Sequence, residues 1–382
     1  MKVAVVKERY PGERRVALVP NNIPQLTKAG FEVFVEADAG REAGFLDAAY
    51  IEKGAEIVPD LSVVMEADMV LCVRCAGADH EAGAAMRGKA RSGQIIIGSC
   101  DPLGQAKAIA DWAPTGSILF SLELIPRITR AQSMDVLSSQ ATIAGYRAVL
   151  IAAMELPKMF PMMMTAAGTL AATKGFVIGA GVAGLQAIAT ARKLGAVVHA
   201  YDVRPACREQ VESLGGKFVE LEIDAGASED KGGYAKAMDE DFYRRQRELM
   251  ASVVAQSDIV ITTAAIPGRP SPRLITADAV RGMQPGSVIV DLAAERGGNC
   301  ELSQPDKRVV ENGVLILGPT NLPAEIPNHA SQMLGNNVVK FLGNLVKKGE
   351  LQLNADDEII RDTMVTRDGQ VISERVSKLL NG

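Results

Sequence analysis

The sequence predicts an α/β protein with two doubly wound parallel-sheet domains of the Rossmann type and a cleft between them. Three observations lead to this prediction. Short apolar segments alternate with helical patterns over residues 1–122, and a second alternating series covers residues 173–317. Such alternation is typical of parallel strands joined by crossover helices. The second series opens with the glycine-rich segment GAGVAG, which lies between a strand and a helix.

Length and composition fit a soluble protein of two domains. A chain of 382 residues is long for one domain. The hydrophobic content of 47% and the charged content of 23% are those of a globular protein with a substantial core. A net charge of −5 and the lack of Lys/Arg blocks argue against nucleic-acid binding. We expect no membrane span, because no apolar run approaches the ~18 residues that a bilayer requires.

In the first half, five apolar segments have the length of strands. They cover residues 3–6, 32–35, 69–73, 94–98 and 117–122. Helical patterns lie between them at residues 23–29, 47–53 and 105–113. A polar loop over residues 126–140 then leads into a long amphipathic helix that ends near Glu155. The methionine run in residues 158–169 is expected to fill the core, which is the commoner use of such residues.

In the second half, six segments have the length of strands, as a doubly wound sheet requires. They cover residues 176–178, 197–201, 217–219, 259–263, 288–292 and 314–317. Residues 225–247 are rich in glycine and charge, which is typical of a functional lid or a disordered loop. A last helix, residues 330–347, should cross back to the first domain. We therefore expect a discontinuous first domain, residues 1–134 and 323–382, and a nucleotide-binding domain, residues 135–322.

The chain is organised around residues 174–204, which read KGFVIGAGVAGLQAIATARKLGAVVHAYDVR. Gly179 permits a tight turn, Gly181 lets a pyrophosphate approach the backbone, and Gly184 lets the helix pack closely on the sheet. That helix directs N–H groups and partial positive charge at phosphates. Asp202 ends the second strand, about 20 residues further on, where a carboxylate accepts ribose hydroxyls. An ordinary glycine turn is the alternative, but the complete pattern favours a dinucleotide.

The five cysteines are scattered along the chain and indicate reduced thiols. Cys72 and Cys75 form a CxxC pair. However, Cys72 lies within an apolar strand segment, and no second pair accompanies it. We expect a buried strand thiol at Cys72 rather than a metal or redox site.

Seven segments match one known family closely. They read PRITRAQSMDVLSSQATIAGYRAV, PMMMTAAGT, GAGVAGLQAIATARKLGAVV, DVR, EQVESLGGKF, GGYAK and ITTAAIPGRP. With them, nearly the whole chain resembles the soluble NAD(H)-binding component of proton-translocating, Re/Si-specific NAD(P) transhydrogenase. The resemblance implies direct hydride transfer from NADH to NADP⁺ on an NADP(H)-binding partner subunit, with proton translocation by a membrane-embedded partner. It also implies a homodimer at the cytoplasmic face of the cell membrane.

The resemblance implies that the polar loop holds the nicotinamide end of NAD(H). Arg127, Gln132 and Asp135 would contact the nicotinamide, with Ile128 and Ser138 adjacent. A carboxamide offers an acceptor oxygen and an NH₂ donor, which Arg, Gln and Asp side chains can match. From the residues alone, an equally good alternative is that Asp135 only caps the following helix and Arg127 is solvated.

In the second domain, the resemblance assigns Gly181, Val182 and Ala183 to the phosphate turn and Asp202 to the adenosine ribose. Arg204 would also contact the nucleotide. Because the carboxylate of Asp202 would repel a 2′-phosphate, we expect NAD rather than NADP to bind. Four further contacts are expected on a mobile lid and at the cleft rim, where a flexible surface is nearly as good an interpretation. They are Gly233, Tyr234, Gln246 and Ala265.

Two alternative functions stand beside this interpretation. The family is related in fold to alanine dehydrogenase, which must place an acid/base group beside its substrate. In alanine dehydrogenases a His and a Lys follow two strands of the first domain, but residues 99–101 here read SCD and residues 73–75 read VRC, although Arg15 is kept. The second alternative is a non-enzymatic NAD(H) sensor. A loop that orients the nicotinamide favours chemistry over sensing, and hydride transfer between nicotinamides needs only proximity and orientation.

Overall fold

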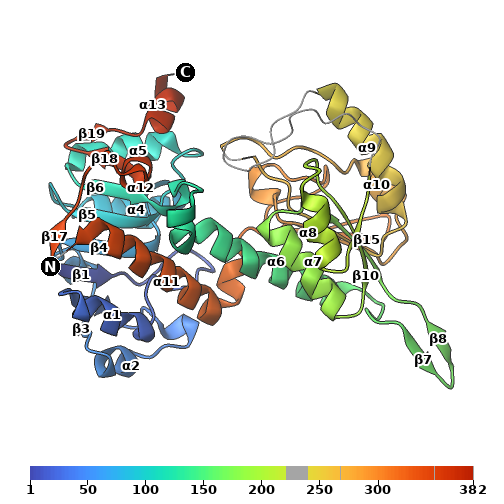
Figure 1. The fold of residues 1–382 in the computed structure, drawn as a ribbon, viewed down its shortest axis with the longest axis horizontal. Helices are drawn as coiled ribbons and strands as arrows, with labels where there is room; N and C mark the ends of the chain where they lie inside the picture. Colours follow the sequence, from blue (N-terminus) through green and yellow to red (C-terminus); the bar gives the residue numbers. More distant parts are fainter. Residues whose placement is uncertain (221–239, 267, 348, 382) are drawn as a thin grey trace. The chain divides into compact units, whose positions relative to one another are not determined.

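The computed structural model describes residues 1–220, 240–266, 268–347 and 349–381 (Figure 1). The chain folds into two compact units. Unit 1 comprises Met1–Gln140 and Pro323–Gly382, and unit 2 comprises Ala141–Leu322. The first division falls after Gln140, inside a helix, whereas the sequence placed it after residue 134.

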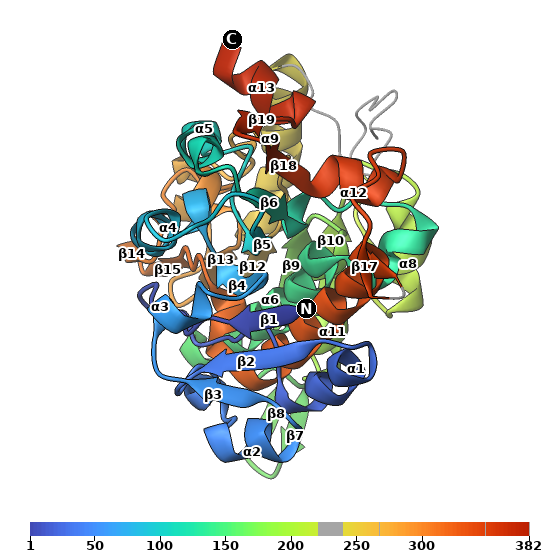
Figure 2. The same ribbon diagram turned by 90° about the vertical axis from the view of Figure 1, so that its left-hand side faces the viewer.

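Unit 1 contains an eight-stranded sheet in the order β19-β18-β6-β5-β4-β1-β2-β3, which Figure 2 shows. The strands are β1 (Lys2–Val5), β2 (Glu32–Glu36), β3 (Glu56–Val58), β4 (Met69–Arg74), β5 (Ile95–Ser99), β6 (Ile118–Ser121), β18 (Met364–Arg367) and β19 (Gln370–Val371). Strands β1 to β6 pair in parallel, and β18 joins β6 antiparallel. The sequence prediction missed β3, β18 and β19, which have only two to four residues each and lack a clear apolar pattern.

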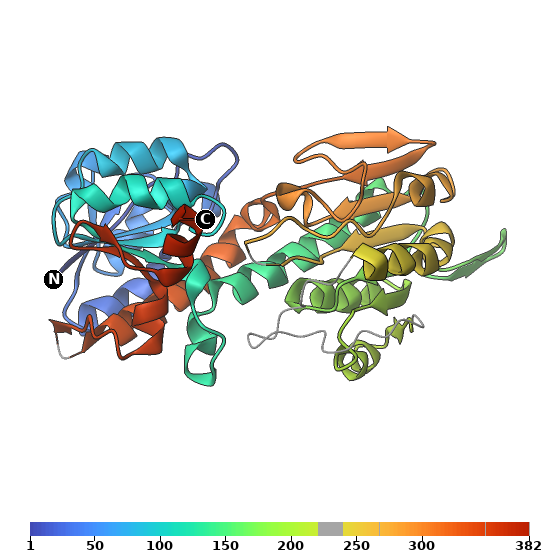
Figure 3. The ribbon, with the colours of Figure 1, turned by 90° about the horizontal axis from the view of Figure 1, so that it is seen from above.

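Helices cover both faces of this sheet (Figure 3). They are α1 (Ile23–Lys28), α2 (Asp47–Glu52), α3 (Leu61–Val64), α4 (His80–Arg87), α5 (Ala106–Trp112), α11 (Pro327–Leu345), α12 (Glu358–Thr363) and α13 (Glu374–Asn381). Side chains of α1 and α11 join one buried cluster, and side chains of α3, α4, α5 and α13 join another. A short hairpin, β16 (Val346–Lys347) and β17 (Glu350–Leu351), follows α11.

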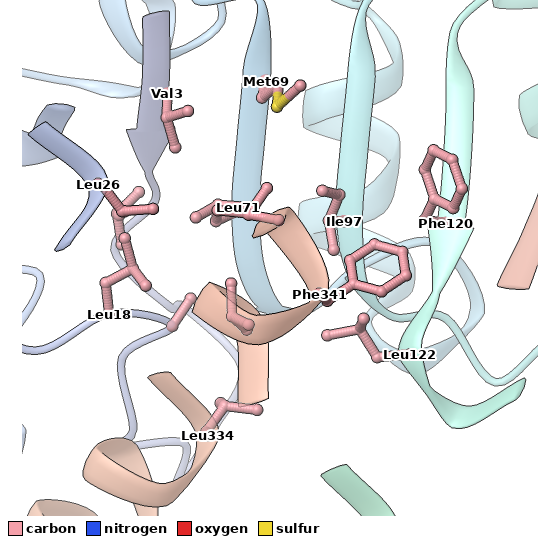
Figure 4. Close-up of a cluster of buried hydrophobic side chains, with 14 of the residues drawn as sticks. Val3, Leu18, Leu26, Met69, Leu71, Ile97, Phe120, Leu122, Leu334 and Phe341 are labelled. Carbon is pink, nitrogen blue, oxygen red and sulfur yellow. The ribbon is translucent and has the colours of Figure 1, made fainter. Parts of the chain in front are cut away.

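Helix α11 contributes a large part of the core of unit 1 (Figure 4). Phe341 is fully buried, and its ring meets that of Phe120 edge to face, with the centroids 5.5 Å apart. Leu334 and Leu342 of the same helix join this cluster. The segment after unit 2 therefore completes the core that the N-terminal strands begin.

Unit 2 contains a seven-stranded sheet in the order β11-β10-β9-β12-β13-β15-β14. The strands are β9 (Lys174–Ile178), β10 (Val197–Tyr201), β11 (Lys217–Phe218), β12 (Ile259–Thr262), β13 (Val288–Asp291), β14 (Arg308–Glu311) and β15 (Val314–Leu317). The edge strand β14 was not predicted. It pairs antiparallel with β15 across Asn312 and Gly313, which both have positive φ, so the Asn-Gly pair was a hairpin signal that the prediction overlooked.

The remaining strands of unit 2 are parallel, and helices cover both faces here as well. The helices are α6 (Val136–Glu155), which begins in unit 1, α7 (Val182–Lys193), α8 (Cys207–Ser213), α9 (Glu240–Ala255) and α10 (Ala277–Arg281). One buried cluster joins α6, α7 and α8, and another joins α9 and α10. The strands β9 and β12 are neighbours at the centre, where the direction of winding reverses.

Helix α6 differs from the expectation of an amphipathic helix and of no long apolar run. It is long and apolar enough, by length and composition alone, to cross a membrane, with a mean hydropathy of 1.2 over its most apolar window. Of that window, 28% is buried within the protein. Ala148, Val149 and Ala152 are fully buried against the sheet of unit 2, and this packing accounts for apolar residues on that side.

The methionine run does not fill the core, so that prediction was wrong. It forms the first strand of a hairpin, β7 (Met163–Thr165) and β8 (Gly168–Leu170), which reaches out from unit 2 (Figure 1). Met162, Met164 and Leu170 are 62%, 76% and 50% exposed. Strands of three residues have no second layer to pack on here, so both faces of the hairpin stay uncovered.

Replacing Phe341 with alanine should destabilise unit 1 by about 3–5 kcal/mol, because the cavity would lie in a close-packed core. Trp112, the single tryptophan, is buried in unit 1, so urea unfolding followed by its fluorescence reports on this unit. Leu379→Ala, at a side chain that is 49% exposed, is the control and should shift the midpoint little. A Phe341→Ala midpoint equal to that of the control would contradict the assigned packing.

Candidate functional site

The turn after β9 has the geometry that the three glycines predict. Gly179 has a φ of +96°, and an added Cβ would lie 2.5 Å from the Oγ1 atom of Thr263. A Cβ on Gly184 would lie 1.8 Å from the carbonyl oxygen of Gly179. These two positions therefore require glycine so that α7 can sit against the strand end.

Gly181 is different, because a Cβ there would meet nothing within 4 Å. It is the N-cap residue of α7, and no side chain caps the helix start. The first-turn N–H groups, including those of Val182 and Ala183, have no helical acceptor and face this open side. Such a helix start suits an anion.

Helix α6 braces the helix start. A Cβ on Gly145 of α6 would lie 2.0 Å from the carbonyl oxygen of Ala183, so the two helices are in backbone contact there. Sequence reasoning did not single out Gly145. A glycine inside an otherwise helical pattern was the signal that could have identified it.

Asp202 follows β10, and its side chain is 5% exposed. Its Oδ2 atom accepts a hydrogen bond of 2.7 Å from the backbone N–H of Ala180, which ties β10 to the glycine turn. Arg204 binds the same carboxylate through its backbone N–H and its guanidinium. The structure therefore places Asp202 at the turn, as predicted, and places Arg204 on Asp202.

The loop after β12 lies beside the glycine turn. The hydroxyl of Thr263 donates to the carbonyl oxygen of Gly179 at 3.1 Å. The buried amide of Asn299 accepts from the N–H of Ala264 at 3.0 Å and donates to its carbonyl oxygen at 2.9 Å. Ala265, the next residue, is exposed, in keeping with its predicted place on the rim. Sequence reasoning missed Thr263 and Asn299, because neither belongs to a motif that it searched.

Gln246 is not a rim residue. It lies on α9, is 3% exposed, and donates from its Nε2 atom to the hydroxyl of Tyr201 at 2.9 Å. The prediction failed because α9 turns this face towards the sheet. Burial raises the pKa of the Tyr201 hydroxyl. The predicted lid contacts Gly233 and Tyr234 lie outside the described residues.

In unit 1, the predicted nicotinamide loop is a 3₁₀ turn, Thr129–Met134, that leads into α6. Asp135 accepts hydrogen bonds from the backbone N–H of Ser138 at 2.9 Å and from its hydroxyl at 2.6 Å, so it caps the helix. Arg127 and Gln132 are exposed, and Ile128 packs partly against the core of unit 1. The capping role of Asp135, which the sequence left open, is present.

Two contacts that the sequence did not predict hold this loop on the C-terminal segment. The guanidinium of Arg130 pairs with the carboxylate of Asp357 at 2.6 Å and donates to Asn344 at 2.9 Å. The Nδ2 atom of Asn337 on α11 donates to the carbonyl oxygen of Ser133 at 2.9 Å. The Arg130 guanidinium lowers the pKa of Asp357 to about 2, so the pair stays charged at neutral pH.

The strand ends of unit 1 carry buried thiols and carboxyl groups. Cys72 is buried, as predicted, and the sulfur atoms of Cys75 and Cys100 are 3.4 Å apart. Burial raises the pKa of Glu8 to about 8, although the backbone N–H of Val73 donates to it. A carboxyl group with such a pKa can act as an acid or base, so alanine dehydrogenase chemistry needs a direct test.

Comparison with family models accounts for nearly the whole chain. Residues 4–144 match the N-terminal domain of the alanine dehydrogenase/PNT family, and residues 148–374 match its C-terminal domain. The chain belongs to the alanine dehydrogenase/PNT family. Membership implies NAD(H) binding, which the glycine turn and Asp202 fit.

Within this family, transhydrogenases are the nearer relatives of this chain. The first part of NAD(P) transhydrogenase subunit alpha from Rhodospirillum rubrum is 46% identical over 97% of this chain and 98% of its own length. A transhydrogenase crystal structure from Sinorhizobium meliloti has a TM-score of 0.87 at 46% identity, covering 97% of this chain and 100% of that one. Alanine dehydrogenase of Bacillus subtilis is 28% identical over 99% and 94%. The predicted resemblance and the predicted α/β class are confirmed.

Two glycine substitutions should separate binding from folding. Gly181→Ala should fold normally, because its methyl group meets open space, yet lower NADH affinity at least about tenfold by blocking the phosphate approach. Gly184→Ala should destabilise unit 2 by about 1–3 kcal/mol, because its methyl group overlaps the Gly179 carbonyl. Thermal melts by circular dichroism and calorimetric NADH titration measure both effects. Wild-type affinity in folded Gly181→Ala would contradict the phosphate assignment.

Proposed function

We propose that this chain is the NAD(H)-binding component of a proton-translocating transhydrogenase. It binds NADH and presents it for direct hydride transfer to NADP⁺ held by a separate NADP(H)-binding subunit. The observation that carries the proposal is the open helix start at Gly181 beside Asp202, in a chain 46% identical to a transhydrogenase subunit over 97% of its length.

The glycine turn would hold the pyrophosphate, and Asp202 the adenosine ribose. Arg127 and Gln132 of unit 1 would fix the nicotinamide, with Asp135 and Ser138 setting the loop from behind. We propose that NAD(H) lies across a cleft between the two units. When bound, NADH supplies the hydride from its ring carbon C4.

The chain's own residues then have a limited task. Hydride transfer between two nicotinamides moves no proton, so it requires reacting carbons held about 3–3.5 Å apart in the right orientation. An acceptor on another subunit can be reached only from the surface, which fits the exposure of Arg127 and Gln132. The anchors Arg130 and Asn337 would stop the loop from drifting.

The rest of the complex would supply NADP(H) binding and the proton pathway. The Rhodospirillum rubrum relative is named as the first part of subunit alpha, so its subunit has a further part. The chain covers 71% of the longer alpha subunit of Cereibacter sphaeroides, to which it is 43% identical. We propose that a membrane-embedded subunit translocates protons and holds this chain at the cytoplasmic face of the membrane.

Shortening Gln132 should separate orientation from affinity. Gln132→Asn should lower the rate of hydride transfer to NADP⁺ about tenfold or more, because small misplacements of the reacting ring are costly. Calorimetric NADH affinity should change less than about twofold, since the adenosine half stays bound. Gln25→Asn, at an exposed glutamine of α1, is the matched control. Equal losses of rate and affinity would make Gln132 a plain binding residue, and wild-type transfer with no rate loss would remove its role.

Alanine dehydrogenase activity is the second candidate, favoured by the Bacillus subtilis relative and by the raised pKa of Glu8. At the strand ends where those enzymes carry Lys and His, this chain has Arg74, which pairs with Glu13 at 3.1 Å, and Cys100. A guanidinium does not release its proton in proteins. We expect no turnover of pyruvate, ammonia and NADH above background in a spectrophotometric assay. Turnover that Glu8→Gln abolishes would replace the proposed function.

We also propose a homodimer. The exposed methionines of the β7–β8 hairpin form an apolar projection that a second chain would cover. Light scattering at micromolar concentration should give twice the chain mass of 40.5 kDa. Met164→Asp should shift the mass towards the monomer, whereas Val310→Asp, at a position 66% exposed on β14, should not. A monomeric wild-type chain would count against the dimer.

A further inference from the structure

The carboxylate of Asp202 is already saturated by groups of this chain. Its Oδ1 atom accepts from the backbone N–H and the Nε atom of Arg204, both at 2.9 Å. Its Oδ2 atom accepts from the N–H of Ala180 at 2.7 Å and from the Nη2 atom of Arg204 at 2.9 Å. A carboxylate offers about four acceptor positions, so none is left for a ribose hydroxyl.

The guanidinium of Arg204 binds this carboxylate as the ribose would. Its Nε and Nη2 atoms form a two-pronged fork, with one donor on each carboxylate oxygen. The 2′- and 3′-hydroxyls of a ribose are also two adjacent donors that can bind both oxygens of one carboxylate. The side chains of Arg204 and Asp202 are only 15% and 5% exposed, so the fork shields the carboxylate from water.

We propose that the Arg204 guanidinium and the adenosine ribose compete for Asp202, so that Arg204 must release the carboxylate when a nucleotide binds. Arg204 is thus a specificity-determining residue that sets the affinity for the adenosine half. This inference rests on the proposed NAD(H) site. It differs from a role for Arg204 as a simple nucleotide contact, because the sign of the mutational effect is reversed.

The backbone bonds to Asp202 need not change during this exchange. The N–H groups of Ala180 and Arg204 hold the carboxylate in place, so only the guanidinium has to move. Apparent affinity falls by the fraction of protein in which the site is competent to bind. Without the guanidinium, that fraction rises and ligands with both hydroxyls should bind more tightly.

The same exchange governs discrimination against a 2′-phosphate. With Arg204 in place, its positive charge offsets the negative charge of Asp202. Once Arg204 is removed, the carboxylate has no neutralising side chain in this pair, and it repels a phosphate group more strongly. NADH binding should therefore tighten while NADPH binding weakens.

Calorimetric titration of the whole chain with ADP and with 2′,3′-dideoxy-ADP tests the proposal. Arg204→Ala should bind ADP about threefold to tenfold more tightly than the wild type, because the competing fork is gone. It should bind the dideoxy analogue with unchanged affinity, because that ligand has no hydroxyls to compete for the carboxylate. Arg204→Met, which keeps the aliphatic stem, covers the case in which the alanine variant does not fold.

Arg208→Ala is the matched control, since it removes a positive charge from the same region without touching Asp202. Arg208 lies over the ring of Phe218, 5.5 Å from its centroid. A charge effect alone would change ADP affinity equally in both variants and would overturn the proposal. Weaker or unchanged ADP binding in Arg204→Ala would also overturn it. Failure of wild-type protein to bind either ADP or NADH would instead remove the proposed function.

In a second arm, NADH and NADPH are titrated into the same variants. The ratio of the two affinities should widen in Arg204→Ala and stay at the wild-type value in Arg208→Ala. A ratio that narrows in Arg204→Ala, with NADPH bound more tightly, would contradict the assigned role.

Discussion

The contact between the start of α7 and the end of β9 is the constraint on which the nucleotide site depends. The helix lies so close that residue 184 has no room for a Cβ beside the Gly179 carbonyl. That approach fixes the backbone of Ala180, whose N–H holds Asp202. It also leaves Gly181 facing open space at the helix start. One backbone contact thereby positions both the phosphate site and the ribose carboxylate.

The loop of unit 1 depends on a different kind of interaction. Its exposed side chains Arg127 and Gln132 sit on a short 3₁₀ turn with little core of its own. The Arg130–Asp357 pair and the Asn337 amide tie that turn to the C-terminal segment. A residue far along the chain therefore controls where the nicotinamide loop lies, which explains why the last segment returns to unit 1.

Motifs with a strict backbone requirement could be predicted from the sequence, whereas tertiary packing could not. The glycine turn and Asp202 were found because only glycine tolerates those approaches, and because the strand spacing is fixed. The burial of Gln246 and the exposure of the methionine run depend on which neighbours lie opposite, and one sequence does not show these. The anchoring of the loop by Asp357 joins residues more than two hundred positions apart, and the fork of Arg204 on Asp202 depends on side-chain rotamers.

The most direct test of the account follows the hydride itself. The chain is mixed with an NADP(H)-binding subunit, NADP⁺ and NADH carrying deuterium at the transferred C4 position, in ordinary water. Mass spectrometry of the NADPH product reports where its new hydrogen comes from. Direct transfer between the two nicotinamides predicts that the deuterium is recovered in NADPH on one face of the ring. Hydrogen from water in the product, with deuterium lost to solvent, would contradict the account.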